Sequence, residues 1–135
     1  MLIIILFKIL GVVFIKGGLH LEAIIILAKC PKTHLMYGIR TQKINRDWWR
    51  TWAFPINEYR ARREGYDITT VEGSLCCTMD YPGCPYCKYK GFVQCYECHK
   101  LSCWGGESHM VCPWCGMVMD NIITSTDFTI SGGDI

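Results

Sequence analysis

The sequence predicts a small β-rich module that is stabilised by bound metal ions. Seven of the ten cysteines of the 135-residue chain lie between Cys84 and Cys115, and six of these seven form C-x-x-C pairs. Few aliphatic residues accompany them, so this segment cannot fold through a hydrophobic core alone. C-x-x-C pairs are typical of metal ligands, because a tight turn brings both thiolates to one ion. We therefore expect a zinc-ribbon-like module of short β-hairpins with two structural zinc sites, preceded by an apolar N-terminal segment and a basic aromatic linker.

The apolar segment is expected to comprise residues 1–28. Its two aliphatic runs are each shorter than the ~20 residues of a membrane-spanning helix, and Lys8, Lys16 and Glu22 interrupt the sequence. Each charge at mid-bilayer costs ~2.5–3.5 kcal/mol, so one clean span is not expected. Three interpretations stay open. The segment is membrane-associated or marginally spanning, or it supplies two buried strands of a larger domain, or its start codon is assigned too far upstream.

The linker is expected over residues 29–75 and is strongly basic. Nine Lys and Arg against two acids give the stretch from Lys29 to Arg63 a charge of +7. Its aromatic residues, with Trp48 and Trp49 among them, are interpreted as a hydrophobic strap that packs on the metal module. The alternative is nucleic-acid binding through interleaved Arg and Trp, which requires exposed aromatic rings.

Two short helices are predicted within the linker. The first is expected over 45–52, with Asn45 as its N-cap and with Pro55 ending it. The second is expected as a helical turn over 57–64 that ends at Gly65, since glycine readily adopts the left-handed conformation that follows a helix.

The metal module is predicted over residues 76–120, followed by a C-terminal tail over 121–135. The C-P-x-C sequence occurs twice, and a proline after the first cysteine presets φ for the turn. Glycine after the second cysteine permits positive φ, although Lys88 takes that place in the first pair. The eight expected zinc ligands are Cys84, Cys87, Cys95, Cys98, Cys103, His109, Cys112 and Cys115. Such a set without carboxylates indicates two closed structural sites and not a catalytic zinc, which keeps one position open for water.

The pairing of these ligands stays open between two schemes. Sequential use, which we favour, assigns Cys84, Cys87, Cys95 and Cys98 to one ion and Cys103, His109, Cys112 and Cys115 to the other. Nested use joins the outer two C-x-x-C pairs and leaves Cys95, Cys98 and Cys103 around the second ion. His99 is the substitute for His109. Cys76 and Cys77 are interpreted as buried or free thiols, and Cys30, which has no cysteine near it in sequence, as structural or without a role.

The module carries a charge opposite to that of the linker. From Glu64 onward, three Lys stand against nine acids, a charge of −6. Because affinity for nucleic acid comes largely from Lys and Arg, the module itself is not expected to follow a phosphate backbone. Thiolate ligands imply a reducing compartment, so we expect a cytoplasmic protein, membrane-associated if residues 1–28 bind a bilayer.

The sequences GCPYC, CYECHKLSCW, GGES and VCPWCG resemble the metal-binding domain at the C-terminus of TerY-type proteins of bacterial tellurium resistance. The resemblance covers about 81–116 and departs from the family at His99, where the family has glycine. That family carries the domain beside a von Willebrand factor A, phosphatase or kinase domain, and no motif of those domains occurs in residues 1–80. The resemblance implies a stand-alone or truncated ribbon with an interaction or scaffolding role in stress response.

The expected function is therefore zinc-dependent protein–protein interaction, without enzymatic activity. Clustered cysteines assigned to metal leave no thiol with a separate base to activate it, which argues against a cysteine nucleophile. Two alternatives remain: a nucleic-acid-binding zinc ribbon that uses the basic Trp/Arg segment, and a zinc domain like the in-between-RING domain of ubiquitin ligases. Neither the partner nor its class is determined by the sequence.

Overall fold

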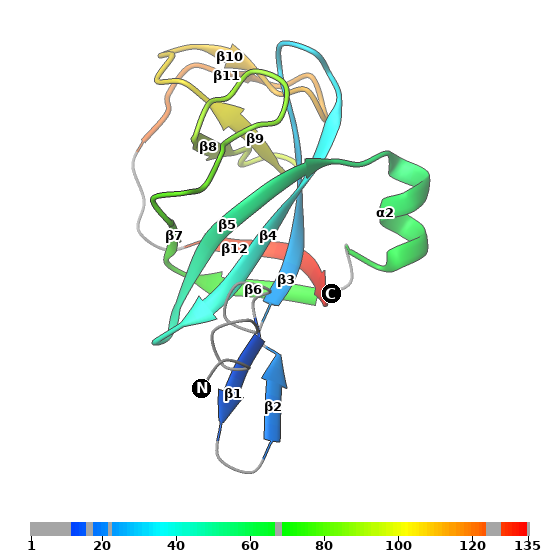
Figure 1. Ribbon diagram of the computed structural model, residues 1–135. Helices are drawn as coiled ribbons and strands as arrows, with labels where there is room; N and C mark the ends of the chain where they lie inside the picture. Colours follow the sequence, from blue (N-terminus) through cyan, green and yellow to red (C-terminus); the bar gives the residue numbers. More distant parts are fainter. Residues whose placement is uncertain (1–11, 16–17, 22, 67–68, 124–127, 135) are drawn as a thin grey trace.

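The computed structural model describes residues 12–15, 18–21, 23–66, 69–123 and 128–134. Figure 1 shows a twisted sheet with one short helix beside it and, at one end, a lobe formed by residues 84–119. Seven cysteines lie in these residues, and we call them the cysteine-rich lobe. The elements are β1 (Val12–Ile15), β2 (Gly18–Leu21), β3 (Ala23–Lys29), β4 (Met36–Ile44), β5 (Asp47–Pro55), α2 (Glu58–Glu64), β6 (Thr69–Gly73), β7 (Leu75–Cys77), β8 (Gly91–Gln94), β9 (Leu101–Trp104), β10 (Met110–Val111), β11 (Val118–Met119) and β12 (Phe128–Asp134).

Eight of these strands form one sheet in the order β6-β12-β3-β4-β5-β7, with β9 also pairing with β3 and β8 pairing with β9. Strand β3 is central in the sheet: β4 pairs with one of its edges, and β12 and β9 both pair with the other. The hairpins β1–β2 and β10–β11 are separate two-stranded sheets. The small β-rich architecture agrees with the predicted fold class at this level.

The second aliphatic run of the N-terminal segment forms the centre of this sheet. Ala23 to Ile26 are all buried, and a strand that is covered on both faces reads as a continuous apolar run. The expected boundary between residues 28 and 29 falls inside β3, so this part of the segment belongs to the same sheet as the linker. The first run begins in residues 1–11, which lie outside the described residues, and its end forms β1. Within the described ranges, no helix is both long and apolar enough to cross a membrane.

The helix predicted over 45–52 is wrong, because this stretch turns back and becomes β5. Asn45 and Arg46 both have positive φ, at 52° and 78°, and lie between the paired residues Ile44 and Asp47. Positive φ at both central residues is the mark of a two-residue type I′ hairpin turn. The aromatic residues that follow favour a strand, and pairing with β4 supplies the hydrogen bonds that a helix would have made internally.

The second predicted helical segment is confirmed as α2. The Asn57 side chain accepts a hydrogen bond from the backbone N–H of Arg60 at 2.8 Å, which caps the first turn. Gly65 follows the helix at φ 72° and donates its N–H to the carbonyls of Ala61 and Arg62. These caps lie within a few residues of the helix, so they could be predicted locally.

The main core joins the sheet to the cysteine-rich lobe. Ile26 of β3, Ile39 of β4 and Leu101 of β9 pack in one cluster with Cys84 and Cys103. A second, smaller cluster contains Cys95, Cys112 and Met119. Since β9 pairs directly with β3, the segments 29–75 and 76–120 share one sheet and one core. The last described part of the expected tail, β12, likewise pairs with β3 and β6.

Candidate metal centres

Four loops of the chain have the same backbone hydrogen-bond pattern, and each starts at a cysteine. In each loop the fifth residue donates its N–H to the carbonyl of the cysteine, and the cysteine donates its own N–H to the carbonyl of the sixth residue. The first bonds join His34 to Cys30 at 2.7 Å, Lys88 to Cys84 at 2.8 Å, His99 to Cys95 at 2.7 Å and Gly116 to Cys112 at 2.9 Å. The return bonds join Cys30 to Leu35, Cys84 to Tyr89, Cys95 to Lys100 and Cys112 to Met117 at 2.8–3.0 Å. We call these four loops the knuckles.

The fifth residue of every knuckle has positive φ. Gly116 has φ 81°, as the C-P-x-C-G pattern predicts, while Lys88, His99 and His34 have φ 70°, 62° and 60°. Non-glycine residues in this conformation cost roughly 1–2 kcal/mol each. Three knuckles adopt this turn without glycine at the fifth position. The sites therefore require the turn conformation and not a glycine residue.

Site A consists of Cys30, Cys84, Cys87 and Cys103, whose sulfur atoms all lie within 4.8 Å of one another. Cys30 comes from the loop after β3, Cys84 and Cys87 from the second knuckle, and Cys103 from β9. Three of the four side chains are completely buried, and Cys87 is half-buried. Site A therefore lies where the lobe joins the sheet.

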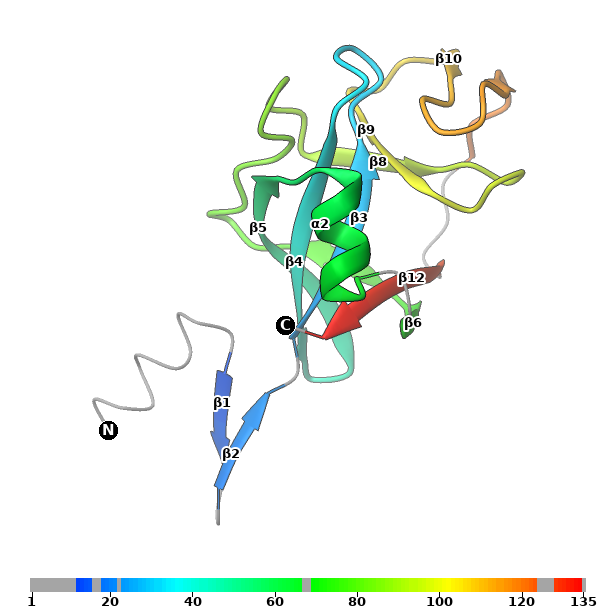
Figure 2. The same ribbon diagram turned by 90° about the vertical axis from the view of Figure 1, so that its right-hand side faces the viewer.

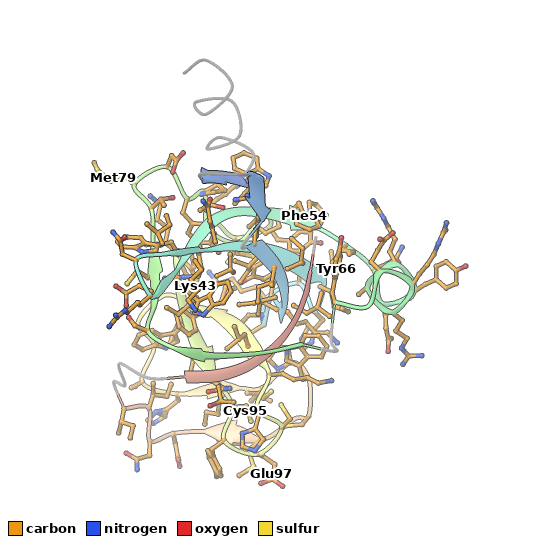
Figure 3. The ribbon with its side chains drawn as sticks, turned by 90° about the horizontal axis from the view of Figure 1, so that it is seen from below. Lys43, Phe54, Tyr66, Met79, Cys95 and Glu97 are labelled. Carbon is orange, nitrogen blue, oxygen red and sulfur yellow. The ribbon has the colours of Figure 1, made fainter. Side chains whose placement is uncertain are left out.

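Site B consists of Cys95, Cys98, Cys112 and Cys115, again with all sulfur atoms within 4.8 Å. Both of its C-x-x-C pairs belong to the lobe, and Cys115 is exposed whereas Cys95 and Cys112 are buried. Figure 3 shows Cys95 within the lobe and Glu97 at its periphery. Site B is thus contained in the lobe.

The sulfur distances suit a shared ion better than disulfides. The Sγ atoms of Cys95 and Cys115 are 3.7 Å apart, as are those of Cys98 and Cys112. Zn–S bonds of ~2.3 Å in a tetrahedron place the sulfurs ~3.8 Å apart, whereas a disulfide needs ~2.05 Å. All ten cysteines are free thiols. Both groups are compatible with one metal ion each.

The electrostatics of site A also call for a cation. Burial raises the pKa of the Cys30 thiol, but hydrogen bonds from the Thr33 side chain and from the backbone of Thr33 and Lys32 outweigh it and hold the pKa at about 7. Burial, followed by the hydrogen bond with Cys87, raises the pKa of Cys103. The two pKa values shift in opposite directions, because hydrogen bonds stabilise the thiolate of Cys30 whereas burial disfavours the charged form of Cys103. A divalent ion would allow all four to bind as thiolates.

Site B has the same asymmetry. Burial raises the pKa of Cys95, but backbone hydrogen bonds from Cys98 and Glu97 outweigh it and lower the pKa overall. Burial, and then hydrogen bonds with the thiols of Cys112 and Cys115, raise the pKa of Cys98 to about 12. Backbone amides directed at sulfur are the outer interactions that orient thiolate ligands around a metal.

Seven of the eight residues expected as ligands lie in these two groups. His109 is exposed and belongs to neither group, and Cys30 provides the fourth thiol of site A. The pairing differs from both schemes that the sequence left open. The third and fourth knuckles form site B, while site A takes the C-x-x-C pair of the second knuckle together with Cys30 and Cys103. The physical reason is the pairing of β3 with β9, which brings Cys30 to Cys103.

A signal for Cys30 was present in the sequence. Cys30-Pro31 repeats the Cys-Pro step of Cys84-Pro85 and Cys112-Pro113. Thr33 stands where the second cysteine of the knuckle would be, so a search for C-x-x-C pairs misses this loop. Cys76 and Cys77 are half-buried free thiols outside both groups.

Comparison with known proteins adds no family assignment. No protein-family model matches this chain, and searches of curated proteins and of solved structures found no match. The class of protein therefore follows from the geometry alone: a small β-sheet protein with two tetracysteine groups, each of which could hold a structural metal ion.

Proposed function

We propose that the chain is a structural zinc protein, without catalytic activity, whose two metal sites hold together a surface for protein–protein interaction. The observation that carries this proposal is the composition of the two groups, each of four thiols within 4.8 Å and without a carboxylate. Four thiolates complete a tetrahedral zinc shell, so no position remains for a reacting water. Tetrahedral sulfur ligands suit zinc or iron, and zinc adds no redox chemistry to a structural role.

The two ions would have different structural roles. An ion in site B would hold the lobe together, and an ion in site A would fasten the lobe to the sheet, since Cys30 follows β3 and Cys103 lies in β9. Structural zinc supplies an apparent ~10–16 kcal/mol in small fingers. That is comparable to the ~5–15 kcal/mol net stability of an ordinary domain, so folding would depend on metal.

Exposed aromatic residues support the interaction role. Tyr59 is 73% exposed and Tyr96 is 66% exposed, and aromatic side chains are enriched among the residues that dominate binding energy at interfaces. The resemblance to TerY-type domains favours the same role, in a bacterial stress response such as tellurium resistance and in the reducing cytoplasm.

Two residues of the basic Trp/Arg segment argue against the nucleic-acid alternative. Trp48 packs against the main core. Arg50 is buried, with its guanidinium over the rings of Tyr81 and Phe92. Neither side chain is presented to a nucleic acid, although Trp52 is 54% exposed.

Elemental analysis of the purified full chain tests the metal proposal, with two zinc ions per chain as the expected result. Fewer than one ion per chain would overturn it, and iron in place of zinc would correct the metal. Affinity capture from a bacterial lysate, with the zinc-loaded chain and with a Cys95→Ser/Cys112→Ser chain as control, tests the interaction. Capture of nucleic acid alone, with a steep salt dependence, would favour the alternative.

A further inference from the structure

A cleft runs between α2, the β3–β4 end of the sheet and the knuckles of site B. Its deeper part is a cavity of about 330 Å³, lined by Leu27, Met36, Ala61, Leu101, Lys100 and Trp114 among others. A second hollow, of about 490 Å³, shares Met36 and Glu58 with the first and continues past Lys29 and Arg60. Figure 2 shows α2 in front of β3 and β4, with the lobe above it and to its right.

The floor of the deeper cavity is apolar. Leu27 projects from β3, Met36 begins β4, and Ala61 lies on the inner side of α2. Volumes near 300 Å³ are at the lower end of binding pockets, which are mostly apolar with a few placed polar groups. Such a cavity accepts one or two aliphatic side chains.

Two lysines lie close to the ring of Trp114 at the edge of this cavity. The Nζ atoms of Lys29 and Lys100 both lie 4.5 Å from the centroid of the Trp114 ring. The ring is held in place because its Nε1 donates a hydrogen bond to the Leu101 carbonyl at 2.7 Å. The indole attracts each ammonium, so that two positive charges lie close to one ring.

The described part of the chain supplies no acid to these lysines. Glu58, the acid in the lining of both hollows, accepts a hydrogen bond from Arg62 at 2.6 Å. Neither Lys29 nor Lys100 forms an ion pair with a described residue. The cleft therefore combines an apolar floor with two lysines at its rim that no carboxylate of the described residues pairs with.

We propose that this cleft binds an acidic peptide segment of a partner protein, with an aliphatic side chain in the cavity and carboxylates at Lys29 and Lys100. This inference rests on the proposed interaction function and names its surface. Charge complementarity selects the occupant, because carboxylates are attracted to two ammonium groups that no described carboxylate pairs with. A nucleic acid fits less well, since the ammonium groups already lie over the ring on which a base would stack. The two knuckles of site B form one wall of the cleft. Because an ion in site B would hold these knuckles in place, peptide binding depends on metal.

The probe is a phage-displayed library of random dodecapeptides, selected on the zinc-loaded full chain. We expect enrichment of peptides that combine Asp or Glu with Leu, Ile or Phe. Binding of a selected, fluorescein-labelled peptide, followed by anisotropy, should weaken by about 30-fold or more in Lys29→Glu/Lys100→Glu, as for other close charge contacts. The control Arg63→Glu/Lys90→Glu makes the same charge change at exposed residues outside the lining and should change affinity less than threefold. A second variant, Ala61→Leu, fills the cavity without altering charge and should also abolish binding.

Zinc content measured on each variant separates the possible failures. Suppose that the chain holds two ions, but the selected peptides lack acidic residues or bind Lys29→Glu/Lys100→Glu as tightly as the parent. This result would overturn the peptide-binding proposal and leave the zinc proposal standing. A chain that selects no peptide but binds oligodeoxythymidine through Lys29 and Lys100 would also overturn it, in favour of nucleic acid. Loss of zinc from the parent chain would remove both proposals.

Discussion

Replacement of Cys30 by serine separates a metal ligand from an ordinary core thiol. Cys30 is completely buried and its sulfur lies within 4.8 Å of the other three thiols of site A. We expect Cys30→Ser to reduce bound zinc from two ions per chain to one. The serine oxygen can accept the amide hydrogen bonds of the knuckle, but it is a poor replacement for a thiolate.

The size of the loss in the free energy of unfolding distinguishes a metal ligand from a core thiol. If Cys30 were only a core thiol, burying a serine hydroxyl in its place would cost ~1–3 kcal/mol. If it is a ligand, the variant also loses much of the ~10–16 kcal/mol that a structural zinc supplies. The free energy of unfolding should then fall by more than ~5 kcal/mol, enough to abolish cooperative folding of a domain of ordinary stability.

Zinc analysis and urea unfolding at a fixed excess of zinc measure both quantities. Cys77→Ser is the matched control, because Cys77 packs against the same core but lies outside both metal groups. It should keep two ions and lose about 1 kcal/mol. If Cys30→Ser keeps two ions and unfolds at the same urea concentration as Cys77→Ser, Cys30 is not a ligand and the assignment of site A is refuted.

Four further predictions follow from the same geometry. Cys103→Ser should lose the ion of site A, and Thr33→Cys in the same chain should restore it, because Thr33 holds the second cysteine's place in its knuckle; elemental analysis that stays at one ion would contradict this. His109→Ala should keep two ions, since His109 is exposed and outside both groups. A chain that starts at Trp48 lacks β3, β4 and Cys30 and should show neither two ions nor cooperative unfolding in circular dichroism. Arg50→Met should lower the free energy of unfolding by roughly 3 kcal/mol, because it removes two charged hydrogen bonds, to the carbonyls of Cys76 and Lys90; a change below 1 kcal/mol would refute this.

The features that could be predicted from the sequence have short-range causes. The three C-x-x-C pairs predict paired thiolates, because each knuckle closes through hydrogen bonds between residues four and five apart. The α2 segment was predictable for the same reason, since Asn57 and Gly65 cap it from its own ends. Local propensity failed at β5, where the choice between helix and strand depended on pairing with β4.

Which thiols lie together depends on long-range strand pairing. Cys30 joins Cys84, Cys87 and Cys103 because β3 and β9 run side by side, and no local pattern records that pairing. The apolar run at residues 23–27 is compatible with a membrane segment or a buried strand until β4, β9 and β12 occupy its edges. Long-range strand pairing carries little sequence signal because its hydrogen bonds join backbone groups that every residue type except proline supplies. The composition therefore predicted metal binding, and the sheet determined the arrangement of the two sites.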